Sequence, residues 1–348
     1  MDHIVWLSGA EADPARLGGK GAGLAKLTSA GLPVPDGFVV TTAAFAAVID
    51  APSRHALHQI AAAGDASSLG ALEETSARLR AEVLSRSAGH RLLSDIAGAY
   101  RRIGDDPPVA VRSSASAEDS ADHSFAGEHD TFLWVRGVDA VLDAVRGCWA
   151  SLYTARALEY RRHEGGIPEG AMAVVVQRMV DARSAGVFMT LNPSNGDRSK
   201  VVIESVWGLG EPVVSGQVDP DRFLVDKVTG QITRRDIAHK PEQAVRGPAG
   251  GLTTVAVASS RQDAPSLTDN EIAALVDHAR RIERAEGCPQ DGEFALTAEP
   301  APHNIHVLQT RPETAWSRRG RPVVAGGRTA MQQILHTIAR QDTAPPGP

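Results

Sequence analysis

The chain has 348 residues, 42% of them hydrophobic, and its 36 basic and 42 acidic residues give a formal net charge of -6. This length can bury the core of a two-lobed globular protein, and the charge gives no electrostatic basis for binding nucleic acid or an anionic membrane surface. The two cysteines, Cys148 and Cys288, lack the spacing of a disulfide framework or a zinc site. Because no apolar run approaches the roughly 20 residues of a membrane span, we expect a cytoplasmic protein.

The first 170 residues have mainly helical patterns, interrupted by prolines. The glycine-rich run Gly18-Gly-Lys-Gly predicts the start of a helix over about 22–30, which Gly31 ends. A longer helix is predicted over 138–152, because its apolar residues recur at helical spacing on one face. Those apolar positions are interpreted as core.

From about Ala171 the sequence changes to short apolar runs separated by turns, which is typical of strands. Strands are predicted at 172–176, 186–190, 201–204, 222–225 and 305–308, with one helix at about 269–285. We therefore predict an α+β protein with a helical N-terminal lobe over 1–180 and a strand-rich C-terminal lobe over 181–316. The segment 317–348 is expected to be a flexible extension or a docking segment, because its proline-rich end resists compact packing.

An arginine ends the buried strand Val109-Ala-Val-Arg112, and a loop rich in hydroxyl and glycine residues follows it as far as Thr131. Arginine offers a fixed fork of donors to phosphate oxygens, and Gly127 lets the backbone approach a ligand closely. Together they predict a site for a triphosphate. Alternatively, Arg112 forms a structural ion pair with Glu118 or Asp119, because a buried arginine needs an anionic partner.

Lys20 lies in the glycine-rich turn before the first predicted helix. There the lysine and the free N–H groups of the helix start would face an anion. The spacing is not that of a P-loop, because Gly21 stands where a hydroxyl residue would follow the lysine. Alternatively, the turn only starts a helix.

Two polar residues follow strands of the second half. Gln177 follows the run Met172–Val176, which would bring its amide to the edge of a lobe, where it would contact a base or a hydroxyl, or only solvent. Glu211 follows a glycine turn after the run 201–205, so it would approach a metal or ligand, or lie on the surface.

Near its end the sequence predicts a hairpin between Asp291-Gly-Glu-Phe-Ala and the run 307–314. Such a hairpin would place Glu293 beside Gln309 and Arg311. Carboxylate and amide oxygens next to a cation are typical of a Mg²⁺–phosphate site, because Mg²⁺ also takes oxygens from the substrate's phosphates. Alternatively, these side chains form the polar edge of the hairpin.

Taken together, these segments resemble the N-terminal ATP-binding domain of phosphoenolpyruvate synthase, pyruvate phosphate dikinase and rifampin phosphotransferase, over roughly residues 4–316. The resemblance implies an ATP-grasp-like fold with ATP and Mg²⁺ as ligands. The matching blocks are Gly18-Gly-Lys-Gly-Ala-Gly-Leu, Gly31-Leu-Pro-Val-Pro-Asp-Gly-Phe, Val111-Arg-Ser-Ser-Ala-Ser-Ala-Glu-Asp, Ser124-Phe-Ala-Gly, Val175-Val-Gln-Arg-Met, Gly208-Leu-Gly-Glu, Val213-Val-Ser-Gly and Leu308-Gln-Thr-Arg-Pro-Glu-Thr.

The resemblance also implies a role for each candidate residue. Catalytic cations on the triphosphate would be Lys20, Arg112 and Arg311, with Gly127 and Thr131 in the loop that covers it, and Gln177 near the adenosine end. Magnesium would be held by Glu293 and Gln309, with Asp291 and Glu211 close to the same site. The cations and Mg²⁺ would neutralise charge that develops on the transferred phosphoryl group.

The sequence departs from the family pattern in three places. Asp291-Gly-Glu-Phe-Ala replaces the more common Asp-Ile-Glu-Trp-Ala, which keeps both carboxylates and changes their packing. Gly21 favours the rifampin phosphotransferases over the synthases, where asparagine is usual. The third departure concerns the histidine that receives the phosphoryl group.

Enzymes of this family have a swivelling domain whose histidine carries phosphate from ATP to an acceptor site. No histidine of this sequence has that setting, and His123 and His129 are interpreted as polar loop residues. We therefore expect a separate partner protein to supply the phosphohistidine and the acceptor site, as in systems that resemble phenylphosphate synthase. The resemblance implies AMP and phosphate as products, because the histidine attacks the β-phosphorus of ATP.

Two other functions stay open on the sequence. A self-contained ATP-grasp ligase or kinase would release ADP and accept a small substrate between the lobes. A non-catalytic ATP-sensing module would bind ATP without turnover.

Overall fold

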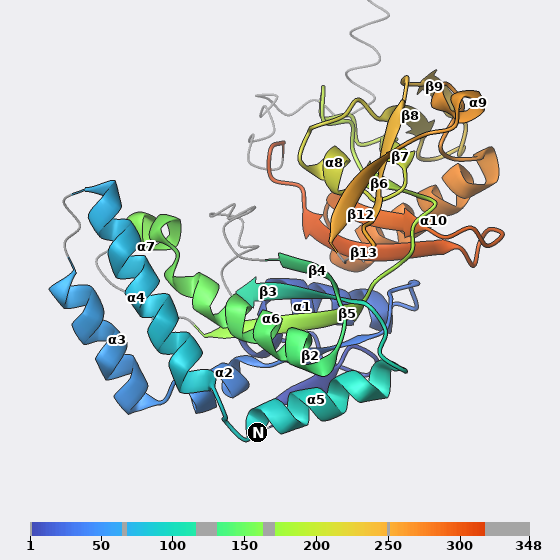
Figure 1. The fold of residues 1–348 in the computed structure, drawn as a ribbon. Coiled ribbons are helices and arrows are strands. Elements are labelled where there is room, and N and C mark those ends of the chain that lie inside the picture. Colours follow the sequence, from blue (N-terminus) through green and yellow to red (C-terminus); the bar gives the residue numbers. More distant parts are fainter. Residues whose placement is uncertain (1, 65–67, 116–130, 163–170, 249–250, 317–348) are drawn as a thin grey trace, which may run out of the picture. The chain divides into compact units, whose positions relative to one another are not determined.

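The computed structural model describes residues 2–64, 68–115, 131–162, 171–248 and 251–316. Within these residues the strands form three antiparallel sheets, which have five, six and two strands (Figure 1). The combination of helices with antiparallel sheets confirms the predicted α+β class. All the elements below lie in one compact unit, Met1–Glu313, and the chain from Thr314 on belongs to a second unit.

The five-stranded sheet has the order β1-β2-β5-β3-β4. Its strands are β1 (Ile4–Trp6), β2 (Gly37–Val40), β5 (Met172–Arg178), β3 (Val109–Ala115) and β4 (Thr131–Val135). The first 170 residues therefore supply four strands as well as helices. The run 172–176 lies in β5, which pairs with β2 and β3.

One face of the five-stranded sheet is covered by helices (Figure 1). They are α2 (Thr42–Val48), α4 (Leu69–Ser87), α5 (Leu92–Ile103) and α6 (Val138–Ala150), with α3 (Ala51–Ala63), η1 (Ser151–Tyr153) and α7 (Ala155–Arg162) around them. Helix α6 and the turn η1 confirm the helix predicted over 138–152. The core on this side, which we call the helix-side core, contains Phe38, Val111 and Trp149.

The six-stranded sheet has the order β13-β12-β6-β7-β8-β9. Its strands are β13 (Ile305–Pro312), β12 (Gln290–Leu296), β6 (Ser184–Met189), β7 (Lys200–Trp207), β8 (Asp221–Asp226) and β9 (Ile232–Asp236). The remaining elements are the hairpin of β10 (Glu242–Arg246) and β11 (Leu252–Ala256), and the helices α8 (Glu211–Val214), α9 (Ser259–Gln262) and α10 (Asp269–Glu286). Helix α10 is the helix predicted at about 269–285. The side chains of Thr268 and Glu271 cap its start reciprocally.

Helix α1 (Pro14–Ser29) links the two large sheets through one hydrophobic cluster, which we call the shared core. Leu17 and Leu24 of α1 are buried in it. The cluster also includes Val175 of the five-stranded sheet and Phe294 of the six-stranded sheet, and α10 closes it with residues such as Ile272. Burial of this much apolar surface is the main force that holds the unit together.

Helix α1 begins eight residues earlier than the glycine-rich run had suggested. Pro14 occupies its first turn, and the side chain of Asp13 accepts a hydrogen bond from the backbone N–H of Ala15 (2.9 Å), which caps the helix start. The glycine run instead marks a kink, because Gly18 has a φ of 69°. A Cβ atom at Gly18 would overlap the carbonyl oxygen of Ser114 in β3. The glycine therefore allows α1 to lie directly against β3.

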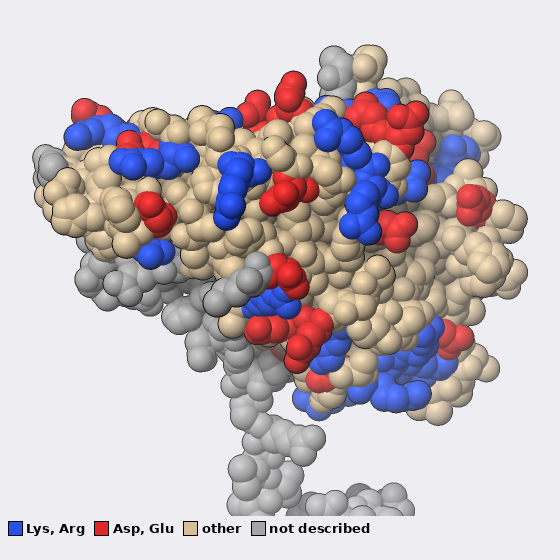
Figure 2. Space-filling view, turned by 90° about the horizontal axis from the view of Figure 1, so that it is seen from below, with Lys and Arg blue, Asp and Glu red and all other residues tan. Residues whose placement is uncertain are grey.

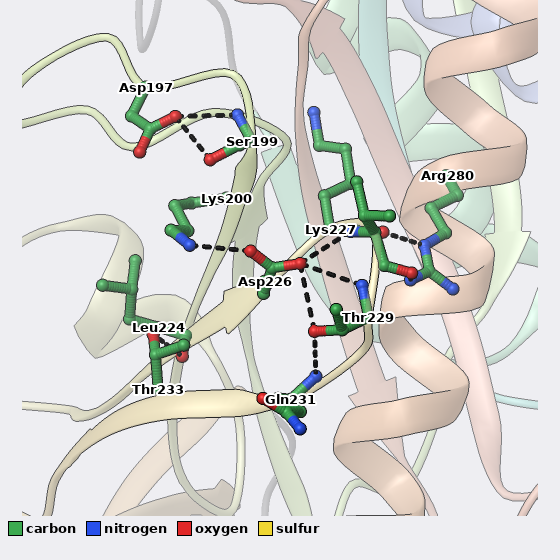
Figure 3. A network of polar contacts seen from close by, with 11 residues as sticks. Asp197, Ser199, Lys200, Leu224, Asp226, Lys227, Thr229, Gln231, Thr233 and Arg280 are labelled. Carbon is green, nitrogen blue, oxygen red and sulfur yellow. Dashed lines mark hydrogen bonds and ion pairs between the residues drawn. The ribbon is translucent and has the colours of Figure 1, made fainter.

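A polar network at the β8–β9 turn attaches the six-stranded sheet to α10 (Figure 3). The carboxylate of Asp226 accepts hydrogen bonds from Lys200 Nζ (2.8 Å) and from the backbone N–H of Thr229 (2.9 Å). Next to it, Lys227 Nζ donates to Glu283 (2.8 Å), and Arg280 Nε donates to the carbonyl of Lys227 (2.7 Å). Glu283 and Arg280 both belong to α10, so the turn fixes this helix on the sheet.

Candidate functional site

The hairpin predicted near the end of the sequence is formed by β12 and β13. Glu293 pairs with Gln309, and Asp291 pairs with Arg311, so these four side chains lie in two neighbouring rows. Gly292 and Phe294 alternate with them along β12 and are buried, Phe294 in the shared core. The hairpin therefore presents one polar face opposite the shared core.

Arg112 of the five-stranded sheet reaches this polar face. Its Nη1 lies 3.2 Å from Gln309 Oε1 and 3.8 Å from Glu293 Oε2. The Nε of Arg112 is buried without a hydrogen-bond partner among the described residues. The alternative partners Glu118 and Asp119 lie outside the described residues. Among the described side chains, the ion pair of Arg112 is therefore with Glu293, which comes from the second large sheet.

Lys20 and Thr131 lie next to Arg112. Lys20 Nζ donates a hydrogen bond to the backbone carbonyl of Ser113 (3.1 Å), the residue that follows Arg112 in β3. Thr131 is the first residue of β4, where it is the direct cross-strand partner of Arg112 and is exposed. Helix α1 and strands β3 and β4 thus bring these three side chains to one place.

Arg311 and Asp291 form a looser ion pair, with 3.6 Å between Arg311 Nε and Asp291 Oδ2. The side chain of Arg311 is 51% exposed and that of Asp291 is 28% exposed, so both can reach a ligand. Burial raises the pKa of the Asp291 carboxyl above its ordinary value, and the nearby charge of Arg311 acts in the opposite direction. A cation bound beside Asp291 would stabilise its charged form.

Gln177 is buried, with 2% exposure, near the end of the central strand β5. The expectation that its amide reaches the edge of a lobe is therefore wrong, because β2 and β3 pair with β5 on both sides. Its Nε2 donates to the carbonyl of Pro35 at 3.5 Å. Gln177 pairs with Ala110, two residues before Arg112, so it shares the sheet face of Arg112.

Two predicted residues are not joined to this group. Glu211 is exposed at the start of the four-residue helix α8. Among the described contacts, its side chain has no hydrogen bond or ion pair with another predicted site residue. Gly127 lies outside the described residues. The structure therefore brings together Lys20, Arg112, Thr131, Asp291, Glu293, Gln309 and Arg311, with Gln177 further along the same sheet face.

Sequence reasoning missed the two serines that follow Arg112. Ser113 supplies the carbonyl that holds Lys20, and Ser114 Oγ donates to the carbonyl of Leu17 (2.9 Å) and accepts from the backbone N–H of Gly21 (3.0 Å). These bonds fix the lysine-bearing turn of α1 beside Arg112. The adjacent serines were visible in the sequence, but their partners lie more than 90 residues away.

The group has the residue types that a Mg²⁺–phosphate site needs. Three cations, Lys20, Arg112 and Arg311, offer donors for phosphate oxygens. The carboxylate of Glu293 and the amide oxygen of Gln309 are neighbours in the hairpin, as ligands of one Mg²⁺ ion would have to be. The donor set therefore fits Mg²⁺ with a bound polyphosphate.

Comparison with known proteins agrees with this class of site. The family model "Pyruvate phosphate dikinase, AMP/ATP-binding domain" matches residues 14–328, and the chain belongs to this family. It is 40% identical to the prodigiosin synthesizing transferase PigC of Serratia marcescens, over 90% of this chain and 33% of that protein. It is 38% identical to the phosphoenolpyruvate synthase of Aeropyrum pernix, over 91% of this chain and 43% of that protein.

A rifampicin phosphotransferase from a Streptomyces species is 40% identical over 86% of this chain and 34% of that protein. The chain thus spans less than half the length of each of these relatives. The resemblance seen in the sequence motifs is confirmed, and the chain contains an ATP-binding domain of the phosphoenolpyruvate synthase and pyruvate phosphate dikinase type.

The described surface carries charges of both signs. On the face shown in Figure 2, acidic and basic side chains lie close to one another, in keeping with the small net charge. Among the helices that the structure describes, none combines the length and the apolar character needed to cross a membrane.

Proposed function

We propose that the chain binds Mg²⁺·ATP between its two large sheets and donates a phosphoryl group to a histidine of a separate protein. The observation that carries this proposal is the position of Arg112, whose Nη1 is 3.2 Å from Gln309 and 3.8 Å from Glu293. A bound triphosphate would accept hydrogen bonds from the arginine and share its oxygens with a Mg²⁺ ion on Glu293 and Gln309.

Each residue then has a distinct task. Lys20, Arg112 and Arg311 hold the triphosphate, Thr131 at the start of β4 lies beside Arg112, and we assign Gly127 to the cover of the triphosphate, as the family resemblance implies. Gln177 lies near the adenosine end, and Asp291 and Glu211 complete the acidic side. The ion supplies positive charge where negative charge develops during transfer.

The proposed reaction releases AMP. A histidine nitrogen of the partner attacks the β-phosphorus of ATP, and the bond between the β-phosphorus and the bridging oxygen of the α-phosphate breaks, so AMP leaves. Water then removes the terminal phosphate, and the histidine keeps one phosphoryl group for the acceptor. The family to which the chain belongs supports this proposal.

The Mg²⁺ site can be tested by calorimetric titration of the chain with ATP, with Mg²⁺ or with EDTA. We expect wild type to bind ATP more tightly with Mg²⁺, and Glu293→Gln to reduce this gain by about tenfold or more, because an amide is a weaker ligand than a carboxylate. The matched control is Glu82→Gln on α4, whose carboxylate pairs with Arg86 (2.8 Å) away from the site. An equal response of both variants would contradict the assignment of Glu293.

The products decide the type of reaction. The chain is incubated with ATP, Mg²⁺ and the partner protein isolated with it from its native source, and the products are followed by phosphorus NMR. AMP and phosphate are expected. ADP formed without the partner would identify a kinase or ligase instead, and tight ATP binding without turnover under any condition would identify a sensor.

A further inference from the structure

Trp134 in β4 has a backbone conformation that is rare for a bulky residue. Its φ is 60°, in the left-handed region. Such a conformation is unfavourable for a bulky residue and persists only where its surroundings require it. The register explains its origin, because Val109 pairs with Val135 while Val111 pairs with Phe132. Strand β4 thus has one residue more than β3 over this stretch, which is a β-bulge.

The bulge changes the direction of one side chain. In a regular strand Phe132 and Trp134 would face the same side, because side chains alternate. Here Phe132 and Val135 both pack against the helix-side core, and Leu133 and Trp134 both belong to another cluster. That cluster contains Leu209 and Ala244, together with Met179 and Ala182. We call it the tryptophan cluster.

The tryptophan cluster joins two segments that carry proposed ATP-binding residues. Strand β4 begins at Thr131, the cross-strand partner of Arg112. Leu209 stands two residues before Glu211, and its backbone N–H donates to the carbonyl of Ala244 (2.9 Å). A movement of the Trp134 ring would therefore displace both segments.

The surroundings of the indole ring are specific. Trp134 is 5% exposed, and its Nε1 is buried without a hydrogen-bond partner among the described residues. The guanidinium carbon of Arg246, an exposed residue that ends β10, lies 5.5 Å from the ring centroid. This is a cation–π distance. The strained backbone at this buried residue indicates a position kept for more than stability.

We propose that Trp134, with Arg246 over its ring, is a positioning residue that holds Thr131 and Glu211 for the triphosphate end of ATP. This inference rests on the proposed ATP-binding function. Because Trp134 acts through residues at the phosphates, its loss weakens ATP binding more than binding of AMP, which has no β- and γ-phosphates. A purely structural tryptophan would affect both nucleotides equally.

The test is calorimetric titration of the full chain with ATP and with AMP, both with Mg²⁺. Trp134→Ala is expected to raise the Kd for ATP about tenfold and to leave that for AMP within about twofold, because small misplacements of binding groups are costly. Arg246→Ala is expected to raise the Kd for ATP about two- to fivefold, as the loss of one exposed cation–π contact implies. Trp134→Phe keeps an aromatic ring and should restore most of the ATP affinity.

Trp149→Phe is the matched control. Trp149 is fully buried in the helix-side core, and its Nε1 also has no partner among the described residues. The Trp149→Phe variant should leave the ratio of the Kd for ATP to the Kd for AMP unchanged. If Trp134→Ala does not fold, Arg246→Ala decides. An unchanged ATP-to-AMP ratio in the folded variants would overturn this inference alone, whereas a wild-type chain that binds no ATP would overturn the proposed function first.

Discussion

Arg112 connects the two large sheets at the candidate site, because its side chain contacts Gln309 and Glu293 of the β12–β13 hairpin. Arg112 is the fourth residue of β3 (Val109–Ala115) and does not end the strand, although its sequence setting had indicated that it does. Its need for an anionic partner could still be predicted from the cost of burying its charge. Which anion it pairs with could not be predicted, because Glu293 belongs to the distant strand β12, and the neighbouring hydrogen bond to Gln309 spans 197 residues. Glu118 and Asp119 carry the same negative charge as Glu293 and are closer to Arg112 in the sequence. Local reasoning therefore could not favour Glu293.

Replacement of Arg112 tests the site directly. Arg112→Lys keeps the positive charge and removes the fork of donors, so the Kd for Mg²⁺·ATP should rise about tenfold or more, because lysine does not replace bidentate contacts. The thermal midpoint should change little. Arg235→Ala, which breaks an exposed two-bond ion pair with Asp269, is the control that should leave ATP binding intact. Unfolding of Arg112→Lys would instead identify a structural ion pair.

The Asp291 carboxyl predicts a pH dependence of stability. Burial raises its pKa above 3.8 in the folded protein, so its ionised form disfavours the folded state at neutral pH. The contribution of Asp291 to the free energy of unfolding is most favourable below about pH 3.8. This contribution is lost as the pH rises through the folded-state pKa. Asp291→Asn should therefore raise the thermal midpoint at pH 7, and the gain should shrink toward pH 4.

Asp226 provides a control of opposite sign for this measurement. The hydrogen bond from Lys200, with those from the turn backbone, lowers the pKa of the Asp226 carboxyl. Its contribution to stability is present above its ordinary pKa of 3.8 and is lost as the pH falls through the folded-state pKa. Asp226→Asn should therefore lower the thermal midpoint at pH 7. Parallel behaviour of the two variants would contradict the opposite pKa shifts.

Among the elements, those with a strong local pattern were predicted well. The helix at 269–286 has a capping box, and the hairpin of β12 and β13 joins two runs separated by a short loop. The start of α1 was predicted too late, because the glycine run was taken as a helix start although it marks a kink at Gly18. The position of β5 between β2 and β3 was not predicted. Strand periodicity describes burial, and it does not say to which sheet a strand belongs.

The kink in α1 can be tested by adding a single methyl group. Gly18→Ala should lower the free energy of unfolding by about 1–3 kcal/mol, because it combines a strained backbone with overlap against Ser114. It should also weaken ATP binding, because Lys20 follows two residues later. Gly70→Ala in α4 is the control, because a Cβ atom there meets nothing within 4 Å. A gain of about 0.5–1 kcal/mol is expected for this helical position. Equal stability of both variants, measured by denaturant unfolding, would contradict the described packing of α1.

At the scale of the molecule, the class and the list of candidate residues could be predicted, whereas their assembly could not. The motifs indicate phosphate chemistry because arginine and lysine bind phosphate oxygens, and carboxylate and amide oxygens bind Mg²⁺. Their convergence depends on two sheets that meet through α1 and Arg112. The buried position of Gln177 follows from strand order, since only the order β2-β5-β3 makes β5 central. Strand order is a property of the whole chain, so local patterns do not contain it.

The shared core has a consequence for how the protein can vary. Leu17 and Leu24 of α1 lie in the same cluster as Ile272 and Val276 of α10, although about 250 residues separate the two helices. The six-stranded sheet therefore shares its main core with α1 and the five-stranded sheet, whereas the helix-side core belongs to the five-stranded sheet alone. If one of the two sheets were replaced by that of a relative, side chains from two different proteins would meet in the shared core. Their shapes would not be complementary. A substitution that changes the side-chain volume in α10 would shift α1, which packs in the same cluster. This shift would move Lys20, although Lys20 is far from the substituted residue.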